Sequence, residues 1–564
     1  MSKTAQERYF SLLSLAQSGD FAAANEALRK ALLATPKDPN LLHLAAQVAG
    51  SLKETDRAIV LYRRAAVAYP HWFEATMNLA RILSLQNKND EALAALKDLA
   101  PHHPQRPEIP EAQAKLSQRT ENLPHAIAFW QKALALRPDN PEGRGQYLFC
   151  CRQVCDWREA PAPDSSLSPN ITAILFDDPA LQRAAAERYC AKHFNRLMPL
   201  PPPPPYAHKK LRVGYLSSDF HAHATSWLIA ELFSLHDRER FEIYAYSYGI
   251  EDHSAIRERL RHEADHFIEL NALTPLQCAE RIRADEIDIL IDLKGHTSGA
   301  RLDILAHRPA PRQMHWLGFP ATTGAPFIDA FVADSVTVPS GSERYFTETV
   351  LRLPHTYQIN DRQKKASEPL SKSAYGLPDK ALVLASFNQT YKITPEIFSV
   401  WCEVLQSVPD SVLWLLESNP FAPDALRQEA TKHGVDPTRL HFAPAAAQED
   451  HLARYGVVDL ALDTFPVGGH TTTSDALWSG VPVVTMAGQS FVSRVAASLL
   501  TAAELPQLIT TNLADYKALA LRLSTDHAER KALHNHLTQK RLSLPLFDTP
   551  RFVKDFEAML IAGH

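Results

Sequence analysis

The chain has 564 residues, of which 45% are hydrophobic and 22% charged, and its formal net charge is −5 at pH 7. This length leaves room for three or four domains of roughly 150 residues each, and the composition excludes a disordered, collagen-like or small disulfide-stapled protein. The net negative charge gives no reason to expect a nucleic-acid partner or an anionic membrane surface.

The first predicted element is a repeat of 34 residues. Prolines recur at this interval, and an alanine precedes each proline by twelve residues: Pro36, Pro70, Pro104, Pro138 and Ala24, Ala58, Ala92, Ala126. Proline ends a helix, and alanine lets a paired helix approach closely. The pattern resembles the tetratricopeptide repeat and predicts an α-solenoid over residues 1–150, in which neighbouring helix pairs bury one another. An alanine-rich bundle without repetition does not explain three identical intervals.

Tetratricopeptide arrays usually bind protein segments, so we expect the repeats to dock protein or peptide partners. A rigid spacer or a dimerisation arm is the alternative that the sequence leaves open.

A connector is predicted over residues 151–207. Around it, the sequence predicts a last helix over 150–158, a loop over 161–169 and a further helix over 179–194. The prolines that follow, up to Pro205, favour an extended segment that acts as a stiff link rather than as a ligand for another domain.

From residue 211 onward, short β-rich runs alternate with amphipathic stretches such as 225–236 and 274–284. This alternation predicts two parallel sheets covered by helices, one in residues 208–372 and one in 373–564. Strands are expected at 211–217, 241–248, 288–293, 313–317 and 330–335, and then at 382–387, 412–416, 440–442, 460–463 and 482–486. Ligands of such sheets bind at the carboxyl ends of the strands, so the loops there should line one cleft.

The loop after the first strand carries Asp219, His221 and His223, and a helix is expected to begin near Thr225. No third ligand at a recognisable spacing accompanies the two histidines, so a metal site is not predicted. A neutral imidazole beside a carboxylate can orient or deprotonate a hydroxyl near neutral pH. Local capping of the helix by these histidines is the alternative.

Two further loops contain groups that suit a phosphate. Gln389 and Lys392 follow the first strand of the second half, and an ammonium group there can act as a point charge. Residues 467–475 place two glycines and three threonines before a helix, and free N–H groups at a helix start favour an anion. Ordinary N-capping by Thr471 or Thr472 shares this geometry.

The sequence contains neither a P-loop nor the Gly-x-Gly-x-x-Gly dinucleotide motif, and it lacks an Asp-x-Asp pair for a divalent metal. A diphosphate would be neutralised by Lys392, backbone amides and a helix end, which predicts chemistry with no metal or other cofactor. Six cysteines without paired spacing, no apolar run of about 18 residues and no export signal predict a cytoplasmic protein with reduced thiols.

Several of these segments, in this order along the chain, resemble the catalytic region of O-linked N-acetylglucosamine transferases, and the likeness is close to the bacterial member from Xanthomonas. The matching segments are SSDF at 217–220 with His223, GARL at 299–302, RPAP at 308–311, WLGFP at 316–320, NQTYK at 388–392, VLWLL at 412–416, GHTT at 469–472 and SRVAAS at 493–498. The resemblance covers residues 208 to near 564. It implies a GT-B fold of two Rossmann-like halves, UDP-GlcNAc as the donor, a Ser or Thr hydroxyl of a protein as the acceptor, and inversion at the anomeric carbon.

The resemblance also implies roles for individual residues. His223, Asp219 and Lys392 match the catalytic positions, with His223 as base or acceptor-side contact and Lys392 on the diphosphate. The positions that match UDP contacts are Gln389, Lys392, His451, Arg454, His470, Thr471, Thr472 and Asp475. The positions that fall beside the donor sugar are Thr225, Gly318, Pro320, Val467 and His470.

This chain departs from the family at four positions. Gln448 stands where a lysine often contacts the ribose, which removes a positive charge, and Val467 replaces a cysteine near the sugar. Ala222 replaces an asparagine, and a histidine is lost near Asn170. Two other functions stay open: transfer of another UDP-sugar, and an adaptor whose cleft only senses UDP-sugars.

Overall fold

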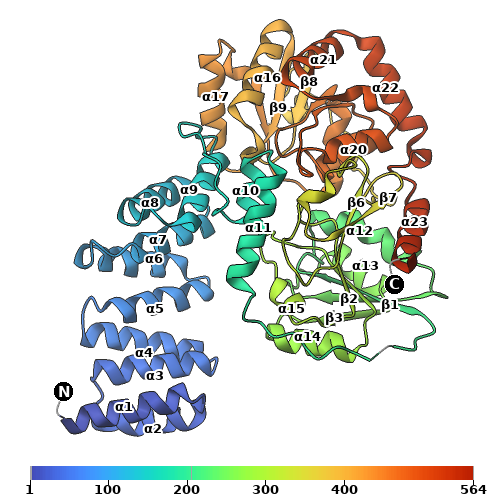
Figure 1. Cartoon of the computed structure of the whole chain (residues 1–564). Helices are drawn as coiled ribbons and strands as arrows, with labels where there is room; N and C mark the ends of the chain where they lie inside the picture. The colour runs from blue at the N-terminus through green and yellow to red at the C-terminus, as the bar shows by residue number, and fades with distance from the viewer. Residues whose placement is uncertain (1–2, 205, 563–564) are drawn as a thin grey trace. The chain divides into compact units, whose positions relative to one another are not determined.

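The computed structural model describes residues 3–204 and 206–562, with side chains from Gln6 onward. The backbone divides after Cys150 into two units, and Figure 1 shows the helices of the first and the two sheets of the second. None of the helices in these described stretches is long and apolar enough to cross a membrane.

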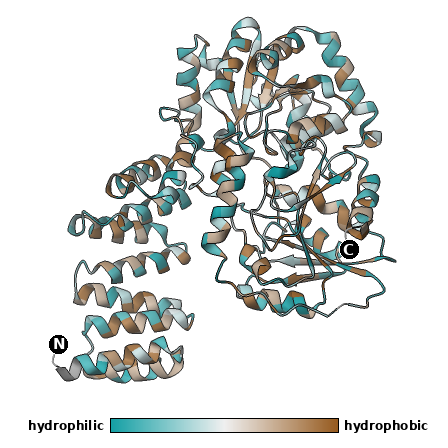
Figure 2. Ribbon diagram, viewed as in Figure 1, coloured by the Kyte–Doolittle hydropathy of each residue, from teal (hydrophilic) through white to brown (hydrophobic). Residues whose placement is uncertain are grey.

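The first unit is a row of helices in consecutive pairs (Figure 1). Its helices are α1 (Lys3–Gln17), α2 (Phe21–Ala34), α3 (Pro39–Ser51), α4 (Thr55–Ala68), α5 (Phe73–Leu85), α6 (Asn89–Leu99), α7 (Glu108–Arg119), α8 (Leu123–Leu136) and α9 (Pro141–Gln153). The four alanines of the repeat, on α2, α4, α6 and α8, are fully buried. Hydrophobic and hydrophilic residues alternate along the helices, as one buried side requires (Figure 2). The predicted tetratricopeptide solenoid is confirmed.

The connector differs from its prediction in two places. The expected helix to residue 158 ends at Gln153, because Cys155 takes a positive φ of 55° and the amide of Asp156 donates back to the Cys151 carbonyl at 2.8 Å. The carbonyl of Gln153 then accepts hydrogen bonds from Thr390 Oγ1 (2.7 Å) and Asn419 Nδ2 (2.8 Å). A short helix, α10 (Pro169–Leu175), precedes α11 (Pro179–His193) and was not expected. The proline segment is held against the first sheet domain, where Leu200 N donates to His307 O at 2.7 Å. Pro205, part of that prediction, lies outside the described residues.

The first sheet of the second unit has seven parallel strands in the order β3-β2-β1-β4-β5-β6-β7. The strands are β1 (Leu211–Ser217), β2 (Phe241–Ser247), β3 (His266–Glu269), β4 (Ile289–Asp292), β5 (Arg312–His315), β6 (Ala330–Asp334) and β7 (Thr349–Leu353). Its principal helices are α12 (Ala224–Leu235), α13 (Ala255–Glu263), α14 (Pro275–Ala284) and α15 (Leu302–Ala306). The five predicted strands are present. The two missed strands, β3 and β7, lie at the sheet edges, where partial exposure removes the apolar run that marks a central strand.

The second sheet has six parallel strands in the order β10-β9-β8-β11-β12-β13. They are β8 (Leu382–Ser386), β9 (Ser411–Leu416), β10 (Leu440–Ala443), β11 (Leu460–Leu462), β12 (Val483–Met486) and β13 (Ile509–Thr510). The helices are α16 (Pro395–Ser407), α17 (Ala422–Lys432), α18 (Gln448–Arg454), α19 (Thr471–Trp478), α20 (Val495–Ala502), α21 (Leu513–Thr525), α22 (His527–Gln539) and α23 (Thr549–Ala562). Two Rossmann-like halves are therefore confirmed. The edge strand β13 was missed.

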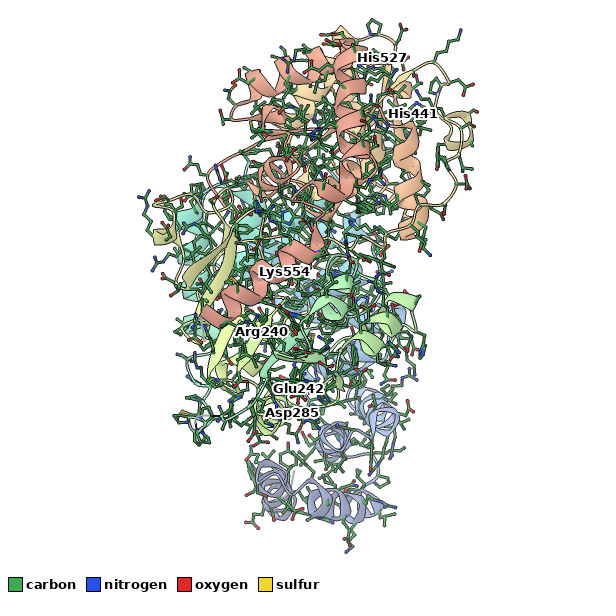
Figure 3. All side chains as sticks on the ribbon, turned by 90° about the vertical axis from the view of Figure 1, so that its right-hand side faces the viewer. Arg240, Glu242, Asp285, His441, His527 and Lys554 are labelled. Carbon is green, nitrogen blue, oxygen red and sulfur yellow. The ribbon has the colours of Figure 1, made fainter. Side chains whose placement is uncertain are left out.

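The last helix leaves the half in which the sequence placed it. Residues 373–564 were assigned to the second half, yet α23 packs on the first, as Figure 1 shows, and Lys554 marks it in Figure 3. The rings of Phe556 and Trp316 lie 4.6 Å apart, and Glu557 Oε1 accepts a hydrogen bond from His236 Nδ1 at 2.9 Å. One hydrophobic core runs through both halves.

Candidate functional site

A lysine and a glycine turn meet at the carboxyl ends of β8 and β11. Lys392 lies in a short 3-10 turn after β8, and its Nζ donates to the carbonyl of Gly468 at 2.9 Å. Burial lowers the pKa of Lys392 to about 8, although the charge of Asp463 opposes this shift. Gln389, three residues earlier, is exposed. The two strand ends thus hold a cation against the backbone of the glycine turn.

The turn is organised by Asp463, which follows β11. Its Oδ1 accepts from the amides of Gly469 (2.6 Å) and Thr464 (2.9 Å), and its Oδ2 accepts from Thr485 Oγ1 (2.7 Å). Burial raises the pKa of Asp463 despite these bonds. A Cβ at position 469 would lie 2.4 Å from Thr473 Oγ1, so only glycine lets the backbone take this path. The turn is fixed before any ligand arrives.

Helix α19 begins at the end of this turn without a side-chain cap. His470 occupies the N-cap position, and no side chain in the described chain accepts from the first amides of the helix. The hydroxyl of Thr472 donates instead to Asn388 Oδ1 at 2.7 Å, so capping by Thr471 or Thr472 is not found. Uncapped amides at a helix start form a ready anion site.

One nitrogen of the His470 ring lacks a partner, whereas the ring also bonds the backbone of Val492. Its Nε2 is buried and makes no hydrogen bond within the described residues. Burial, assisted by the charge of Lys392, lowers the pKa of His470 to about 3, so the ring is neutral. A buried polar atom left unpaired costs free energy, and a ligand with a suitable oxygen would recover it.

Asp475, on α19, is held by two side chains from elsewhere in the fold. Lys364 Nζ lies 2.7 Å from its Oδ1, and Gln448 Nε2 donates to its Oδ2 at 3.2 Å. The Lys364 and Asp475 side chains are 1% and 2% exposed. Gln448, which stands where the family often has a lysine at the ribose, thus reaches this carboxylate as a neutral donor, and Lys364 supplies a cation from the segment that links the two halves.

His451 and Arg454 lie together on α18 around a ring that follows β8. The Phe387 ring is 5.7 Å from the ring of His451, and the guanidinium of Arg454 lies 5.5 Å from its centre. Burial lowers the pKa of His451 to about 4. Two nitrogens of Arg454 are buried without a hydrogen-bond partner in the part of the chain described. The predicted pair is thus brought together, beside an aromatic face.

In the first half, Asp219 pairs with a lysine that the sequence analysis did not single out. Lys294 Nζ lies 2.8 Å from both carboxylate oxygens of Asp219, and both side chains are buried. His223 is 3.6 Å from the same carboxylate through Nδ1. The charge of Asp219 is therefore met chiefly by Lys294.

His223 is the N-cap of α12. Its Nδ1 accepts the amide of Thr225 at 3.2 Å, so the capping alternative describes one of its contacts correctly. Burial lowers the pKa of His223, and the nearby charge of Asp219 opposes this only in part. The neutral ring that accepts at Nδ1 carries its proton on Nε2, and 42% of the side chain is exposed.

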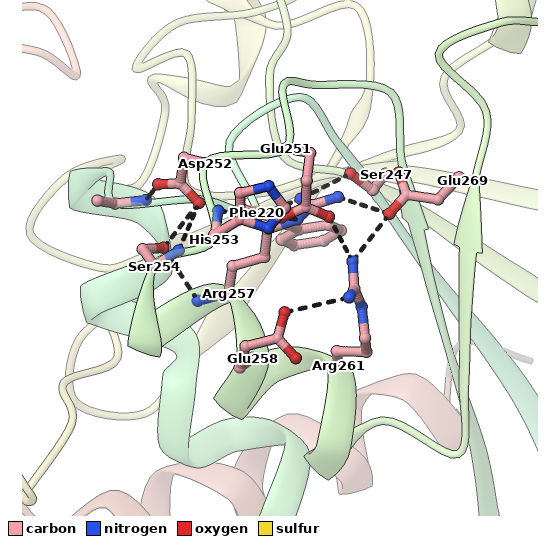
Figure 4. A network of polar contacts seen from close by, with 11 residues as sticks. Phe220, Ser247, Glu251, Asp252, His253, Ser254, Arg257, Glu258, Arg261 and Glu269 are labelled. Carbon is pink, nitrogen blue, oxygen red and sulfur yellow. Dashed lines mark hydrogen bonds and ion pairs between the residues drawn. The ribbon is translucent and has the colours of Figure 1, made fainter.

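A second loop supports the loop that bears His223 (Figure 4). The buried Arg257 donates through Nη1 to the carbonyl of Phe220 at 2.5 Å, and Asp252 Oδ2 accepts the amide of Ala222 at 2.8 Å. A Cβ at Gly249 would lie 1.9 Å from the carbonyl oxygen of Ser218. The two loops therefore fit backbone against backbone.

The remaining predicted positions are spread around these groups. Gly318 lies against the Leu293 carbonyl, where a Cβ would approach to 2.0 Å. Thr225 and Val467 are buried, and Pro320 is half-buried. Among the residues that the structure describes, no direct hydrogen bond or ion pair joins His223 or Asp219 to Lys392, so the predicted catalytic residues form two groups, one on each half.

The residues that sequence reasoning missed divide into two kinds. Lys294, Asn388 and Asp463 each follow a strand, at the sheet edge where ligand groups gather, so the rule already applied to Lys392 could have found them. Lys364 lies in a linker without periodicity, and only the folded chain brings it to Asp475.

Together, the fold and the site define a protein of tetratricopeptide repeats followed by two Rossmann-like halves, with an anion-binding turn at the strand ends of the second half. The chain belongs to glycosyl transferase family 41, which residues 203–368 and 366–556 match. Residues 49–116 match the tetratricopeptide repeat.

Three similar proteins are named for the same chemistry. The probable UDP-N-acetylglucosamine–peptide N-acetylglucosaminyltransferase SEC of Arabidopsis thaliana is 37% identical over 399 residues, which are 67% of this chain and 41% of the relative. The UDP-N-acetylglucosamine–peptide N-acetylglucosaminyltransferase of Caenorhabditis elegans is 30% identical over 465 residues, covering 62% of this chain and 40% of the relative. The chain thus spans about two fifths of the length of these relatives. A solved mutant of the Thermobaculum terrenum O-GlcNAc transferase superposes with a TM-score of 0.66 at 28% identity, over 99% of this chain and 97% of that one.

Proposed function

We propose that this protein transfers N-acetylglucosamine from UDP-GlcNAc to Ser or Thr hydroxyls of proteins, with inversion and without a metal ion. The relatives named for this activity support the substrate class. The observation that carries the proposal is the meeting of Lys392, the Gly468 turn and the uncapped start of α19 at one sheet edge.

In the proposed reaction, the acceptor hydroxyl attacks the anomeric carbon while UDP leaves. Negative charge then grows on the diphosphate, where the Lys392 ammonium and the α19 amides can stabilise it. The amides of Thr471 and Thr472, the Nε2 atom of His470 and the exposed side chain of Gln389 are proposed to meet this charge as hydrogen-bonding groups. These groups are present before the reaction, so little reorganisation is required.

On the acceptor side, His223 is proposed to orient the hydroxyl rather than to take its proton, which passes to the departing phosphate oxygen of UDP or to water. Its Nδ1 already accepts the Thr225 amide, so the neutral ring offers Nε2–H as a donor. Asp219, paired with Lys294, holds the loop in place and is not available as a free base.

The nucleoside and the sugar are assigned by position. Asp475, held by Lys364 and Gln448, is proposed to meet the ribose, and His451 and Arg454 are proposed to pack the uracil. The donor sugar would lie between the halves, next to Thr225, Gly318, Pro320 and Val467. The repeats are proposed to dock protein acceptors in the cytoplasm. Closeness to the Xanthomonas member stays a prediction.

The test is a transfer assay with radiolabelled UDP-GlcNAc on lysate proteins, run with and without EDTA. We expect label on protein in both cases, and loss of label in EDTA would overturn the metal-independent mechanism. Competition by unlabelled UDP-glucose identifies the sugar: stronger competition than by UDP-GlcNAc would show another donor. Donor binding without transfer to any protein would favour the adaptor function.

A further inference from the structure

The first unit contains a groove whose lining residues have no role in the proposed reaction. It has a volume of about 830 Å³ and lies between α6, α7 and α8, which follow one another in the stack (Figure 1). This volume is in the range of pockets that hold a ligand or an anchoring side chain. All residues that line the groove belong to residues 93–136.

The floor of the groove is apolar. Ile109 and Pro110 form its buried base. Leu93, Phe129 and Leu136 are at least partly exposed and supply the accessible apolar surface above it. An accessible apolar floor with polar edges is typical of a protein-binding site.

The edges of the groove carry only one sign of charge. Lys97 on α6, Arg106 in the following loop and Lys132 on α8 line it, together with His103 and His125, and no Asp or Glu does. None of the three permanent cations forms an ion pair with a carboxylate in the described part of the chain. Arg106 and Lys132 lie instead over the rings of Phe73 and Phe129, at 4.7 and 5.6 Å.

Several cations elsewhere in the solenoid pair with acids of the same or another helix. Examples are Arg63 with Glu91, Lys115 with Glu142 and Arg137 with Glu111. The whole chain is also net negative. Three cations without a carboxylate partner are gathered on one apolar groove whose lining contains no acid, and this arrangement complements an acidic ligand.

We propose that this groove binds a segment of a partner protein that carries several carboxylates around one large apolar side chain. The apolar residue occupies the floor, and the carboxylates meet Lys97, Arg106 and Lys132. The inference rests on the docking role proposed for the repeats and specifies the chemistry of the partner, but it does not require sugar transfer.

The test is an array of random twelve-residue peptides probed with the full-length chain. We expect the bound peptides to be enriched in Asp and Glu and to contain a Trp, Phe or Leu. The Kd of the strongest binder, measured by fluorescence anisotropy, should rise at least tenfold in the double variant Lys97→Glu, Lys132→Glu. Phe129→Ala should weaken the same peptide without removing the preference for acid.

The matched control is Arg29→Glu, Arg81→Glu, which changes the net charge equally at exposed positions of α2 and α5 outside the groove. It should leave the Kd unchanged. Absence of acidic enrichment, equal weakening by the control, or tighter binding of a single-stranded RNA of the same charge would each overturn the proposal. Donor hydrolysis, assayed on the same samples, reports on the transferase separately: intact hydrolysis with no acidic preference rejects the groove alone.

Discussion

Lys392 is the residue on which the proposed stabilisation of the leaving group depends most. Its ammonium lies at the turn that precedes α19. Lys392→Ala should lower kcat by about 10²–10³-fold, the usual loss when one prepared donor to a developing charge is removed. The affinity for UDP, measured by titration calorimetry, should fall much less. Lys380→Ala, at an exposed position, is the control, and equal losses of kcat and UDP affinity would contradict the assigned role.

The same lysine predicts a pH limit. Because its pKa is lowered to about 8 in the free enzyme, the cation is present below that pH and is lost as the pH rises through it. We expect kcat/KM to fall above about pH 8. In Lys392→Arg, where the guanidinium stays charged, the remaining activity should not show this decline. If kcat/KM declines identically in both enzymes, the fall above pH 8 belongs to the titration of another group.

The buried pair of Lys364 and Asp475 predicts a strong effect on stability. Lys364→Met leaves the carboxylate with only Gln448, and an uncompensated buried charge costs about 3–5 kcal/mol. The thermal midpoint should therefore drop. Adding Asp475→Asn should recover much of it, because the unpaired charge is gone. If the double variant is no more stable than Lys364→Met, the pair is not the cause.

At the scale of residues, the sequence predicted groups that follow strands and missed groups that depend on tertiary contact. Lys392 and His470 could be predicted because a strand end and a glycine turn mark them. The pairing of Asp219 with Lys294 joins loops 75 residues apart, and that of Lys364 with Asp475 spans 111 residues. No local pattern encodes such distances.

Among the elements, the loop that bears His223 depends on the loop after β2. Arg257→Lys removes the guanidinium group, whose Nη1 and Nη2 donate to the Phe220 carbonyl and to Glu269. We expect kcat to fall ten- to hundredfold, since a displacement of about 1 Å in a positioned group has this effect. KM for UDP-GlcNAc should change less than kcat, because the contacts proposed for UDP lie on the other half.

Arg261→Lys is the control for this variant. Arg261 pairs with Glu251 and Glu269, as Arg257 does, but it does not contact the Phe220 carbonyl (Figure 4). Steady-state kinetics of both enzymes should separate them. Equal losses of kcat in the two variants would show that the ion pairs with Glu251 and Glu269, and not the bond to the Phe220 carbonyl, support the loop that bears His223.

The helices and strands predicted from the sequence agree with the structure where the elements are long or lie in the centre of a sheet. The repeat helices and the ten predicted strands carry periodic or continuous apolar residues, which report burial directly. The three missed strands are edge strands with mixed exposure. The end of α9 could not be predicted, because it depends on a positive φ at Cys155, a residue type that does not signal this conformation in the sequence.

For the whole molecule, α23 makes the stability of the two halves inseparable. Phe556 packs on Trp316, and both are buried in the core that the halves share. Phe556→Ala should cost about 3–5 kcal/mol and lower the melting temperature. Differential scanning calorimetry should show the second unit melting in one transition, shifted as a whole. A first half that melts at its original temperature would refute this coupling.

The packing of α23 on the first half also determines the order in which parts of the chain can fold during translation. Ribosomes deliver the chain from its N-terminus, and domains generally fold as they emerge. The repeats bury their own apolar surface, so they can fold early. Trp316 stays uncovered until Phe556, some 240 positions later in the chain, has been synthesised. Nascent chains that stop before α23 would leave this tryptophan face uncovered and open to chaperones and proteases, so a prematurely ended translation product would be cleared rather than accumulate as a half-built enzyme.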